Sequence, residues 1–261
     1  MSDYLKQRDG APAGFFEAEA AGLRWLAEPA VVPVVELLDH DGEHLRLARL
    51  VDGRPTAESA RAFGAGLARL HDAGAPAFGW APSGTAWFGP LTDPFTVPAN
   101  SHDDFATYWA EDRLRPLLER AAGHLGAEGV AEVEAAIGVI RAGAYSGISG
   151  RGTETPSRVH GDLWAGNIMW PDTVGTLIDP AAHGGHRLED LALLSLFGAP
   201  HLIEILDGYA EQHPMPADWR DDLPAHLFFA LLAHVVLFGG GYVAESIRTA
   251  RQIVTRARQL R

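Results

Sequence analysis

The first part of the chain alternates between helical and extended patterns of hydrophobic residues. Apolar residues recur at three- and four-residue steps over Phe15–Ala27, which predicts an amphipathic helix. Tyr4–Lys6 and His44–Val51 have extended character, and Ala30–Leu38 is rich in β-branched residues, with Pro33 marking an edge or a break. The order strand, helix, strand, turn and strand predicts a small α+β lobe.

The rest of the chain is mainly helical in pattern, and it begins after the Asp-Gly-Arg-Pro sequence at 52–55. Thr56 is suited to cap a helix that continues to His71. After a long loop over 74–100, a helix is predicted over His102–Ala122, with a kink at Pro116. Further helices are predicted over Val130–Ala142, Leu188–Phe197, His201–His213, Ala217–Asp222 and Leu223–Leu260, the last divided by glycines 239–241. We therefore expect an α+β fold of two lobes, residues 1–51 and 52–261.

Composition narrows the classes of protein. The 261 residues are 47% hydrophobic, which is enough apolar material for a buried core. The net charge of −13 argues against general nucleic-acid binding, because phosphate contacts need clustered Lys and Arg. The absence of cysteine excludes disulfides and thiolate catalysis. The start has no apolar signal core, and the oily stretch Leu227–Phe238 is too short to span a bilayer. We therefore expect a cytoplasmic protein without membrane contact.

The segment Val159–Ile168, with the sequence V-H-G-D-L-W-A-G-N-I, contains the residues best suited to chemistry. Asp162 and Asn167 have the spacing of the H-x-D-x-x-x-x-N catalytic loop of kinases. Asp179 ends a second apolar run, beyond a predicted turn over 171–175. Two short strands joined by that turn would bring Asn167 and Asp179 close together.

This trio suits phosphoryl transfer. The reaction needs a carboxylate at the acceptor hydroxyl, and Asp162 is placed for that role. Asn167 and Asp179 offer the oxygen ligands that Mg²⁺ prefers, while His160 and the glycine after it would shape the loop. The alternative is a capped turn, because Asp and Asn are common in glycine-rich loops.

The same block resembles the H-G-D-L-W-x-G-N signature of the fructosamine (ketosamine) kinase family, which is related to aminoglycoside and choline kinases. The resemblance covers nearly the whole chain and includes Phe15–Leu23, Asp179–Ala181, Asp190–Ala192, His234 and Phe238. Trp164 is its most specific single mark. The resemblance implies a protein-kinase-like fold with a small, N-terminally reduced α+β lobe and a large helical lobe.

For the nucleotide, the resemblance implies contacts in the small lobe. Lys6 would contact the phosphates of ATP, and Glu19 on the following helix would pair with Lys6. The backbone of Ala48 and Leu50 would hydrogen-bond the adenine. As alternatives, Lys6 could be a solvated residue near the chain end, and Glu17 could take the place of Glu19.

For catalysis, the resemblance implies Asp162 as the base, with Asn167 and Asp179 as Mg²⁺ ligands. Asp190 would be a buried acid that braces the catalytic loop, or alternatively a residue of a helix terminus. The candidates for contact with the acceptor are Trp164, His183 and His186. Two histidines in a glycine-rich loop could instead suggest zinc, although no third and fourth ligand is evident at suitable spacing.

The N-terminal lobe departs from the family pattern. Two strands and a glycine-rich loop over the phosphates should precede the strand lysine, but five residues precede Lys6. A recorded start that is too late, a natively reduced lobe, or a loop supplied by another chain would each explain this. The loop adds backbone N–H contacts to the phosphates, whereas the base and the metal ligands lie elsewhere.

We expect an ATP- and Mg²⁺-dependent kinase that phosphorylates a sugar hydroxyl of a ketosamine, such as a fructosamine or ribulosamine adduct of an amine or of protein lysine. A related kinase acting on an amino alcohol or an aminoglycoside is one alternative. A non-catalytic kinase-like binding module is another, which the intact Asp162, Asn167 and Asp179 oppose. A metal-dependent hydrolase is a weaker alternative. The sequence leaves open the amine, the hydroxyl and the oligomeric state.

Overall fold

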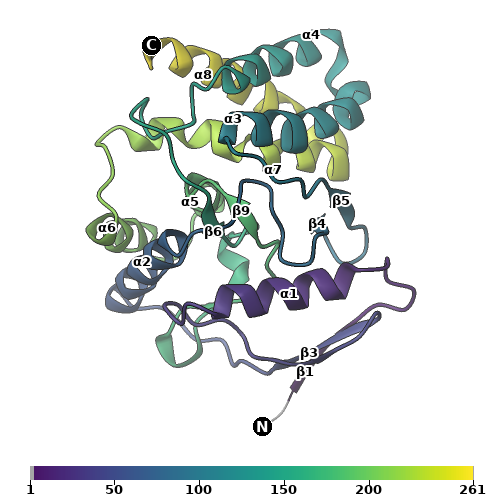
Figure 1. Ribbon diagram of the computed structural model, residues 1–261, viewed down its shortest axis with the longest axis vertical. Coiled ribbons are helices and arrows are strands. Elements are labelled where there is room, and N and C mark those ends of the chain that lie inside the picture. Colours follow the sequence, from purple (N-terminus) through teal and green to yellow (C-terminus); the bar gives the residue numbers. More distant parts are fainter. Residues whose placement is uncertain (1–2, 261) are drawn as a thin grey trace.

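The computed structural model describes residues 3–260 as two lobes, with the two ends of the chain at opposite ends of the molecule (Figure 1). The small lobe has a three-stranded antiparallel sheet in the order β1-β3-β2, formed by β1 (Asp3–Gln7), β2 (Leu37–His40) and β3 (His44–Ala48). Helix α1 (Phe15–Ala27) lies along this sheet (Figure 1). The predicted order of a small α+β lobe and a mainly helical lobe is confirmed, whereas the boundary at 51/52 stays a prediction.

Helix α1 and strand β3 form the core of the small lobe and set the direction of Lys6. Phe16 and Leu23 of α1 pack with Leu45 and Leu47 of β3, and each of the four is at most 4% exposed. In the pairing of β1 with β3, Lys6 lies directly opposite Leu45. Because residues directly opposite in an antiparallel pair share a face, Lys6 points toward α1.

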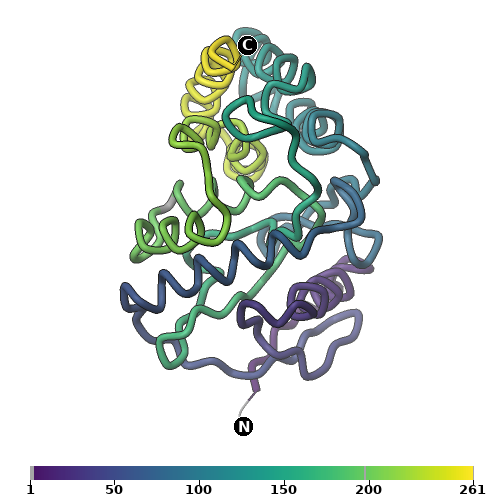
Figure 2. Tube along the Cα trace, turned by 60° about the vertical axis from the view of Figure 1, so that its left-hand side comes forward, coloured from purple at the N-terminus to yellow at the C-terminus, as the bar shows by residue number. Residues whose placement is uncertain are grey.

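The large lobe is built from long helices. Figure 2 shows the C-terminal helices gathered at one end of the molecule and α2 beside α6 nearer the small lobe. The helices are α2 (Ala57–Asp72), α3 (Phe105–Thr107), α4 (Arg115–Arg141), α5 (Leu188–Phe197), α6 (Leu202–Gln212), α7 (Leu223–Phe238) and α8 (Val243–Gln259). A π-helical segment, η1 (Tyr108–Leu114), joins α3 to α4. Short 3₁₀ turns complete the lobe: η2 (Ala165–Asn167), η3 (Pro171–Thr173), η4 (Trp219–Asp222) and η5 (Gly239–Tyr242).

Helices α2 and α6 pack closely because glycine stands at their crossing. A Cβ on Gly64 would lie 1.9 Å from the carbonyl oxygen of Ile205, and a Cβ on Gly208 would lie 2.0 Å from that of Arg61. Only glycine permits this approach of two backbones. The close packing fixes the position of α2, which holds His71 at its C-terminal end.

Three two-stranded antiparallel sheets connect the helices. They are formed by β4 (Ala86–Phe88) with β5 (Phe95–Val97), β6 (Ser157–Val159) with β9 (His183–Gly185), and β7 (Ile168–Met169) with β8 (Thr176–Leu177). The segment that carries the predicted catalytic residues begins at the end of β6 and runs through the β7–β8 hairpin to β9. Regular pairing therefore fixes both ends of this segment.

The predicted helices over Phe15–Ala27 and Leu188–Phe197 are confirmed with the same bounds, and Thr56 caps α2 by accepting a hydrogen bond from the Ser59 N–H. Other predictions were wrong in detail. Ala30–Leu38 is largely irregular: Val34 forms an isolated bridge with Leu177, and regular strand pairing begins only at Leu37 in β2. Strand β3 ends at Ala48 rather than at Val51.

The predicted helix over His102–Ala122 begins instead at Phe105 and widens into a π-helix. Pro116 lies in the first turn of α4, directly after the π-helical segment, and the backbone leaves helical geometry at Gly126 instead (φ 67°). The predicted helix over 130–142 is the second part of this same α4. The loop over 74–100 contains the β4–β5 hairpin.

Helix α7 lies in the core of the large lobe. The helical run Trp219–Gln259 contains a stretch of mean hydropathy 2.0, so by length and composition alone it could cross a membrane. Such a stretch is equally typical of a core helix, and Phe228 and Leu232 of α7 are fully buried among residues of α4 and α8. We interpret α7 as a core helix on the strength of this packing.

Candidate active site

The catalytic loop is held by one buried carboxylate from α5. Asp190 is 1% exposed and accepts hydrogen bonds from the backbone N–H groups of His160 (2.8 Å) and Gly161 (2.9 Å). The Nε2 atom of His71 lies 3.1 Å from the same carboxylate. Burial alone would raise the pKa of Asp190, but its bonds to His71 and His160 outweigh that effect and hold the pKa below its usual value. This geometry is what a residue that braces the loop requires.

His160 lies inside the loop rather than at its surface. Its ring is fully buried, and Nε2 donates to the carbonyl of Ile178 at 2.8 Å. The carbonyl of His160 in turn accepts from the N–H of Ala181 at 3.0 Å. His160 therefore ties the catalytic loop to the strand segment that leads to Asp179, which is a structural role.

Asp162 faces the main cavity of the molecule. Gly161 before it has a left-handed backbone (φ 81°), and the side chain of Asp162 accepts from Asn167 Nδ2 at 3.0 Å. Burial raises the pKa of Asp162 to about 7, against the lowering effect of that hydrogen bond. A carboxylate that binds a proton near neutrality and reaches a cavity is suited to act as a general base.

The β7–β8 hairpin brings Asn167 and Asp179 together, as the sequence predicted. Ile168 pairs with Leu177, and the N–H of Ile178 donates to the carbonyl of Asn167 at 3.1 Å. Asp179 has a left-handed backbone (φ 51°), which is uncommon for a residue other than glycine and is often found at functional sites.

Lys6 links the small lobe to this hairpin. Its Nζ lies 2.8 Å from Glu19 Oε2 and 3.3 Å from Asp179 Oδ1, so the predicted pairing of Lys6 with Glu19 is present. Burial would lower the pKa of Lys6, but the two carboxylates more than compensate and raise the pKa. Burial raises the pKa of Glu19 to about 7. Glu17, the alternative partner, is exposed.

The oxygen atoms at this site fit a hard divalent cation. Asn167 uses Nδ2 to donate to Asp162, so its side-chain oxygen is the atom available as a ligand, beside the carboxylate of Asp179. Carboxylate and amide oxygens are the ligands that Mg²⁺ takes, together with phosphate oxygens. Within residues 3–260, no group of three or more His, Cys, Asp or Glu residues is arranged to hold a metal, which also leaves the zinc alternative without a ligand set.

A cavity of about 590 Å³ connects the acidic residues to an aromatic wall. Lys6, Glu19, Asp162, Asn167 and Asp179 all line it. Aromatic side chains form much of the remaining wall: Trp87, Phe88, Trp164, His234, Phe238 and Tyr242. Trp164 is 42% exposed, and its predicted place at the acceptor site stays a prediction.

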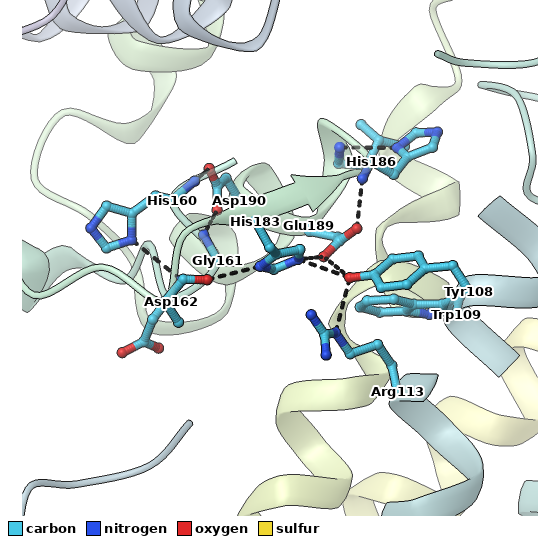
Figure 3. Close-up of polar contacts among 12 residues, drawn as sticks. Tyr108, Trp109, Arg113, His160, Gly161, Asp162, His183, His186, Glu189 and Asp190 are labelled. Carbon is cyan, nitrogen blue, oxygen red and sulfur yellow. Dashed lines mark hydrogen bonds and ion pairs between the residues drawn. The ribbon is translucent and has the colours of Figure 1, made fainter. Parts of the chain in front are cut away.

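His183 belongs to a buried polar network (Figure 3). It is not among the residues that line the cavity. Its Nδ1 donates to the carbonyl of Ala181 at 2.8 Å, and its Nε2 lies 2.8 Å from the hydroxyl of Tyr108. Glu189 lies 3.1 Å from the same Nε2, and Arg113 Nε donates to the Tyr108 hydroxyl at 2.9 Å. His183 thus positions the chain just after Asp179, and this geometry does not support its prediction as an acceptor contact.

His186 is also remote from the cavity wall. It is fully buried, its ring centre lies 4.2 Å from that of His226, and Phe105 packs beside both rings. Burial lowers the pKa of His186 well below its usual value. The prediction that His186 contacts the acceptor therefore has no support in the structure.

Ala48 and Leu50 lie outside the lining of this cavity. The N–H of Ala48 donates to the carbonyl of Glu36 at 2.9 Å, so this donor is already engaged. The role of both residues in binding adenine stays a prediction.

Sequence reasoning missed Tyr108, Arg113 and Glu189. Tyr108 and Arg113 are five residues apart, a spacing that places two side chains on the same side of a π-helix but not of an α-helix. The interval of five residues between Tyr108 and Arg113 was the available signal. Glu189 gave no separate signal, because it adjoins Asp190 at the start of a predicted helix.

Comparison with known proteins identifies relatives along the whole chain. The family model described as fructosamine kinase matches residues 3–256. A probable ketoamine kinase from Enterococcus faecium is 32% identical over 254 residues, which cover 93% of this chain and 84% of the relative. The crystal structure of a candidate fructosamine-3-kinase from Thermobifida fusca is 38% identical, with a TM-score of 0.86, and the match covers 97% of this chain and 85% of that one.

A more distant structure bears on the fold alone. A choline kinase from Streptococcus pneumoniae has a TM-score of 0.59 at 14% identity, over 97% of this chain and 85% of that one. The predicted protein-kinase-like fold is confirmed by these likenesses. Together with the match over residues 3–256, they show that the chain belongs to the fructosamine kinase family, a family of phosphotransferases that use ATP.

Proposed function

We propose that this protein transfers the γ-phosphoryl group of ATP to a sugar hydroxyl of a ketosamine, such as a fructosamine or ribulosamine adduct of an amine or of protein lysine. The observation that carries the proposal is the convergence of Asp162, Asn167, Asp179 and Lys6 on one cavity. The names of the relatives agree with this acceptor class, since they are ketoamine and fructosamine kinases.

Each residue of the constellation has a role in the proposed transfer. The acceptor hydroxyl oxygen forms a bond to the γ-phosphorus while the bond from that phosphorus to ADP breaks, and the hydroxyl proton passes to Asp162. Lys6, held by Glu19, contacts the phosphates. Trp164 borders the acceptor.

Mg²⁺ is the cation that the oxygen ligands suit. Asn167 and Asp179 would hold it, and when bound it neutralises charge on the nucleotide phosphates. Asp190 and His160 act at one remove, because they fix the loop on which Asp162 lies.

The test is ATP turnover with Mg²⁺, with and without a synthetic fructosamine, in wild type and in Asp162→Ala. We expect turnover that depends on fructosamine and is lost in the variant, while nucleotide binding measured by calorimetry survives. Asp103→Ala is the control, since Asp103 is exposed, precedes α3 and is outside the cavity lining. Undiminished turnover in Asp162→Ala would overturn the role of this residue. Nucleotide binding without turnover in wild type would favour a binding module.

A further inference from the structure

The cavity has an aromatic end formed by helix α7 and the 3₁₀ turn after it. His234, Phe238 and Tyr242 follow one another at four-residue intervals and all line the cavity. Their ring centres are 5.5 Å apart for His234 and Phe238, 4.8 Å for His234 and Tyr242, and 6.2 Å for Phe238 and Tyr242. The three rings therefore form one cluster rather than three separate side chains.

Phe238 is the most solvent-exposed residue of this cluster. It is 59% exposed, although it is a large apolar side chain beside a deep cavity. Exposed aromatic residues at a cavity edge commonly contact a ligand, because covering them removes apolar surface from water. The ligand that covers Phe238 has to present an apolar group at this position.

The charge of the cavity bears on the sign of the group that contacts the aromatic cluster, since the proposed phosphate contacts use Lys6 and Mg²⁺. The acidic groups of the cavity are Glu19, Asp162 and Asp179, against one cation, Lys6, which is already paired with two of them. Aromatic faces likewise attract cations. Both features favour a positive group here, and the net charge of −13 adds to the same attraction.

We propose that the aromatic cluster of His234, Phe238 and Tyr242 binds the protonated amine of the acceptor together with an apolar substituent on that amine. The inference rests on the proposed function, since a ketosamine has such a nitrogen next to its sugar. It adds a preference: acceptors whose amine carries an alkyl or aromatic group are favoured over those whose amine carries a carboxylate. Phe238 and Tyr242 are then residues that determine specificity.

The experiment compares fructose adducts that share the sugar and differ in the amine: benzylamine, butylamine and glycine. We expect kcat/KM to fall in that order, because glycine places a carboxylate against an acidic, aromatic wall. Phe238→Ala should raise the KM for the benzylamine adduct about tenfold, as loss of one cation–π and apolar contact of about 1.4 kcal/mol implies. The KM for ATP should not change.

Ile203→Ala is the matched control, because Ile203 is a large apolar residue that is 71% exposed and lies outside the cavity lining. The kinetics of Ile203→Ala should equal those of wild type. The KM of Phe238→Leu for the benzylamine adduct should lie between the values of wild type and Phe238→Ala. Turnover of the adducts with an unchanged KM in Phe238→Ala would overturn the inference and leave the proposed function intact. A preference of the wild type for the glycine adduct would also overturn the inference, as would a Phe238→Ala variant in which only the KM for ATP is raised. No turnover of any adduct would overturn both.

Discussion

Two buried tyrosines of the large lobe show how similar residues differ in their connection to the active site. The hydroxyl of Tyr108 lies 2.8 Å from His183, whose ring donates to the carbonyl of Ala181. The hydroxyl of Tyr145 donates to the carbonyl of Ile253 at 2.7 Å, within the C-terminal helices. Both tyrosines are at most 1% exposed, so only their partners distinguish them.

We predict that Tyr108→Phe lowers kcat about ten- to a hundredfold, because a loosened His183 lets the segment after Asp179 shift by a fraction of an ångström. The Mg²⁺ concentration for half-maximal activity should rise in the same variant. Steady-state kinetics across a Mg²⁺ titration measures both quantities.

Tyr145→Phe is the control for a purely structural effect of Tyr108→Phe. Tyr145→Phe loses one buried hydrogen bond, so it should lower the free energy of unfolding by about 1 kcal/mol. Tyr108→Phe loses the contacts of its hydroxyl with His183 and Arg113, so it should lower that free energy by about 2 kcal/mol. Only Tyr108→Phe should change the kinetics. Equal kinetics in the two variants would show that Tyr108 contributes to stability alone.

At the residue scale, the sequence was sufficient where a motif fixes both spacing and chemistry. Asp162, Asn167 and Asp179 follow from the catalytic pattern, and they do meet in one cavity. The sequence was insufficient for His183 and His186, because a glycine-rich loop does not reveal which side chains turn inward. Both histidines are buried, whereas Trp164 is exposed. The residues that bury them lie on α3, η1 and α7, which are distant in sequence.

At the scale of elements, the β7–β8 hairpin depends on a glycine that packs against the core. A Cβ on Gly175 would lie 2.5 Å from Cδ2 of Phe63, which is buried on α2. Phe63 in turn packs on Trp170, with ring centres 5.6 Å apart. The hairpin has no room to accept a larger residue unless it moves away from α2.

We predict that Gly175→Ala lowers both activity and stability, because movement of the hairpin separates Asn167 from Asp179. The cost in the free energy of unfolding should be about 1–3 kcal/mol, as for other overpacked sites. Denaturant unfolding and ATP turnover measure the two effects.

Gly138→Ala is the matched control, since a Cβ at Gly138 meets no atom within 4 Å and the residue lies inside α4. This variant should gain about 0.5–1 kcal/mol from helix propensity and keep full activity. A stable, fully active Gly175→Ala would contradict the close packing of the hairpin.

Elements with strong periodicity were predictable, whereas the irregular ones were not. Phe15–Ala27 has an unbroken apolar face, and its bounds were found from sequence. The π-helix was missed because the spacing of apolar residues was interpreted with a period of 3.6 residues throughout. The kink was assigned to Pro116 because proline disrupts the interior of a helix, whereas the structure places Pro116 in the first turn of α4. The position of proline relative to a helix start is not visible before the start is known.

At the scale of the whole molecule, three buried histidines make stability depend on pH. Burial lowers the pKa of His71 and of His186, and it lowers the pKa of His226 to about 3. In the unfolded chain the pKa of histidine is about 6.5, so below that pH the unfolded state binds protons that the folded state does not. Their contribution to stability is therefore complete above about pH 6.5 and declines as the pH falls.

We predict that His226→Phe makes the free energy of unfolding fall less steeply between pH 6.5 and pH 5. The slope should decrease by up to about 1.4 kcal/mol per pH unit, which is the contribution of one proton. The raised pKa values of Asp162 and Glu19 act in the opposite direction in wild type and variant alike, so the difference between the two isolates His226. Urea unfolding at several pH values gives the slopes.

His201→Asn serves as the control, because His201 is exposed at the start of α6 and has a left-handed backbone that asparagine tolerates. The change of its free energy of unfolding with pH should have the same slope as in wild type. If His226→Phe also matched wild type, the buried ring would have to be protonated in the folded protein, contrary to its surroundings.

The carboxylate of Asp190 has a consequence for the order in which the molecule assembles. It binds His71 at the end of α2 and the backbone of His160 and Gly161, while belonging itself to α5. Three segments that are far apart in sequence therefore meet at one side chain, and the loop amides have no such partner until α2 and α5 have docked. We therefore expect the catalytic loop to take its shape late in folding, so that a chain that has not completed its large lobe cannot yet present Asp162, the proposed base, to ATP and acceptor.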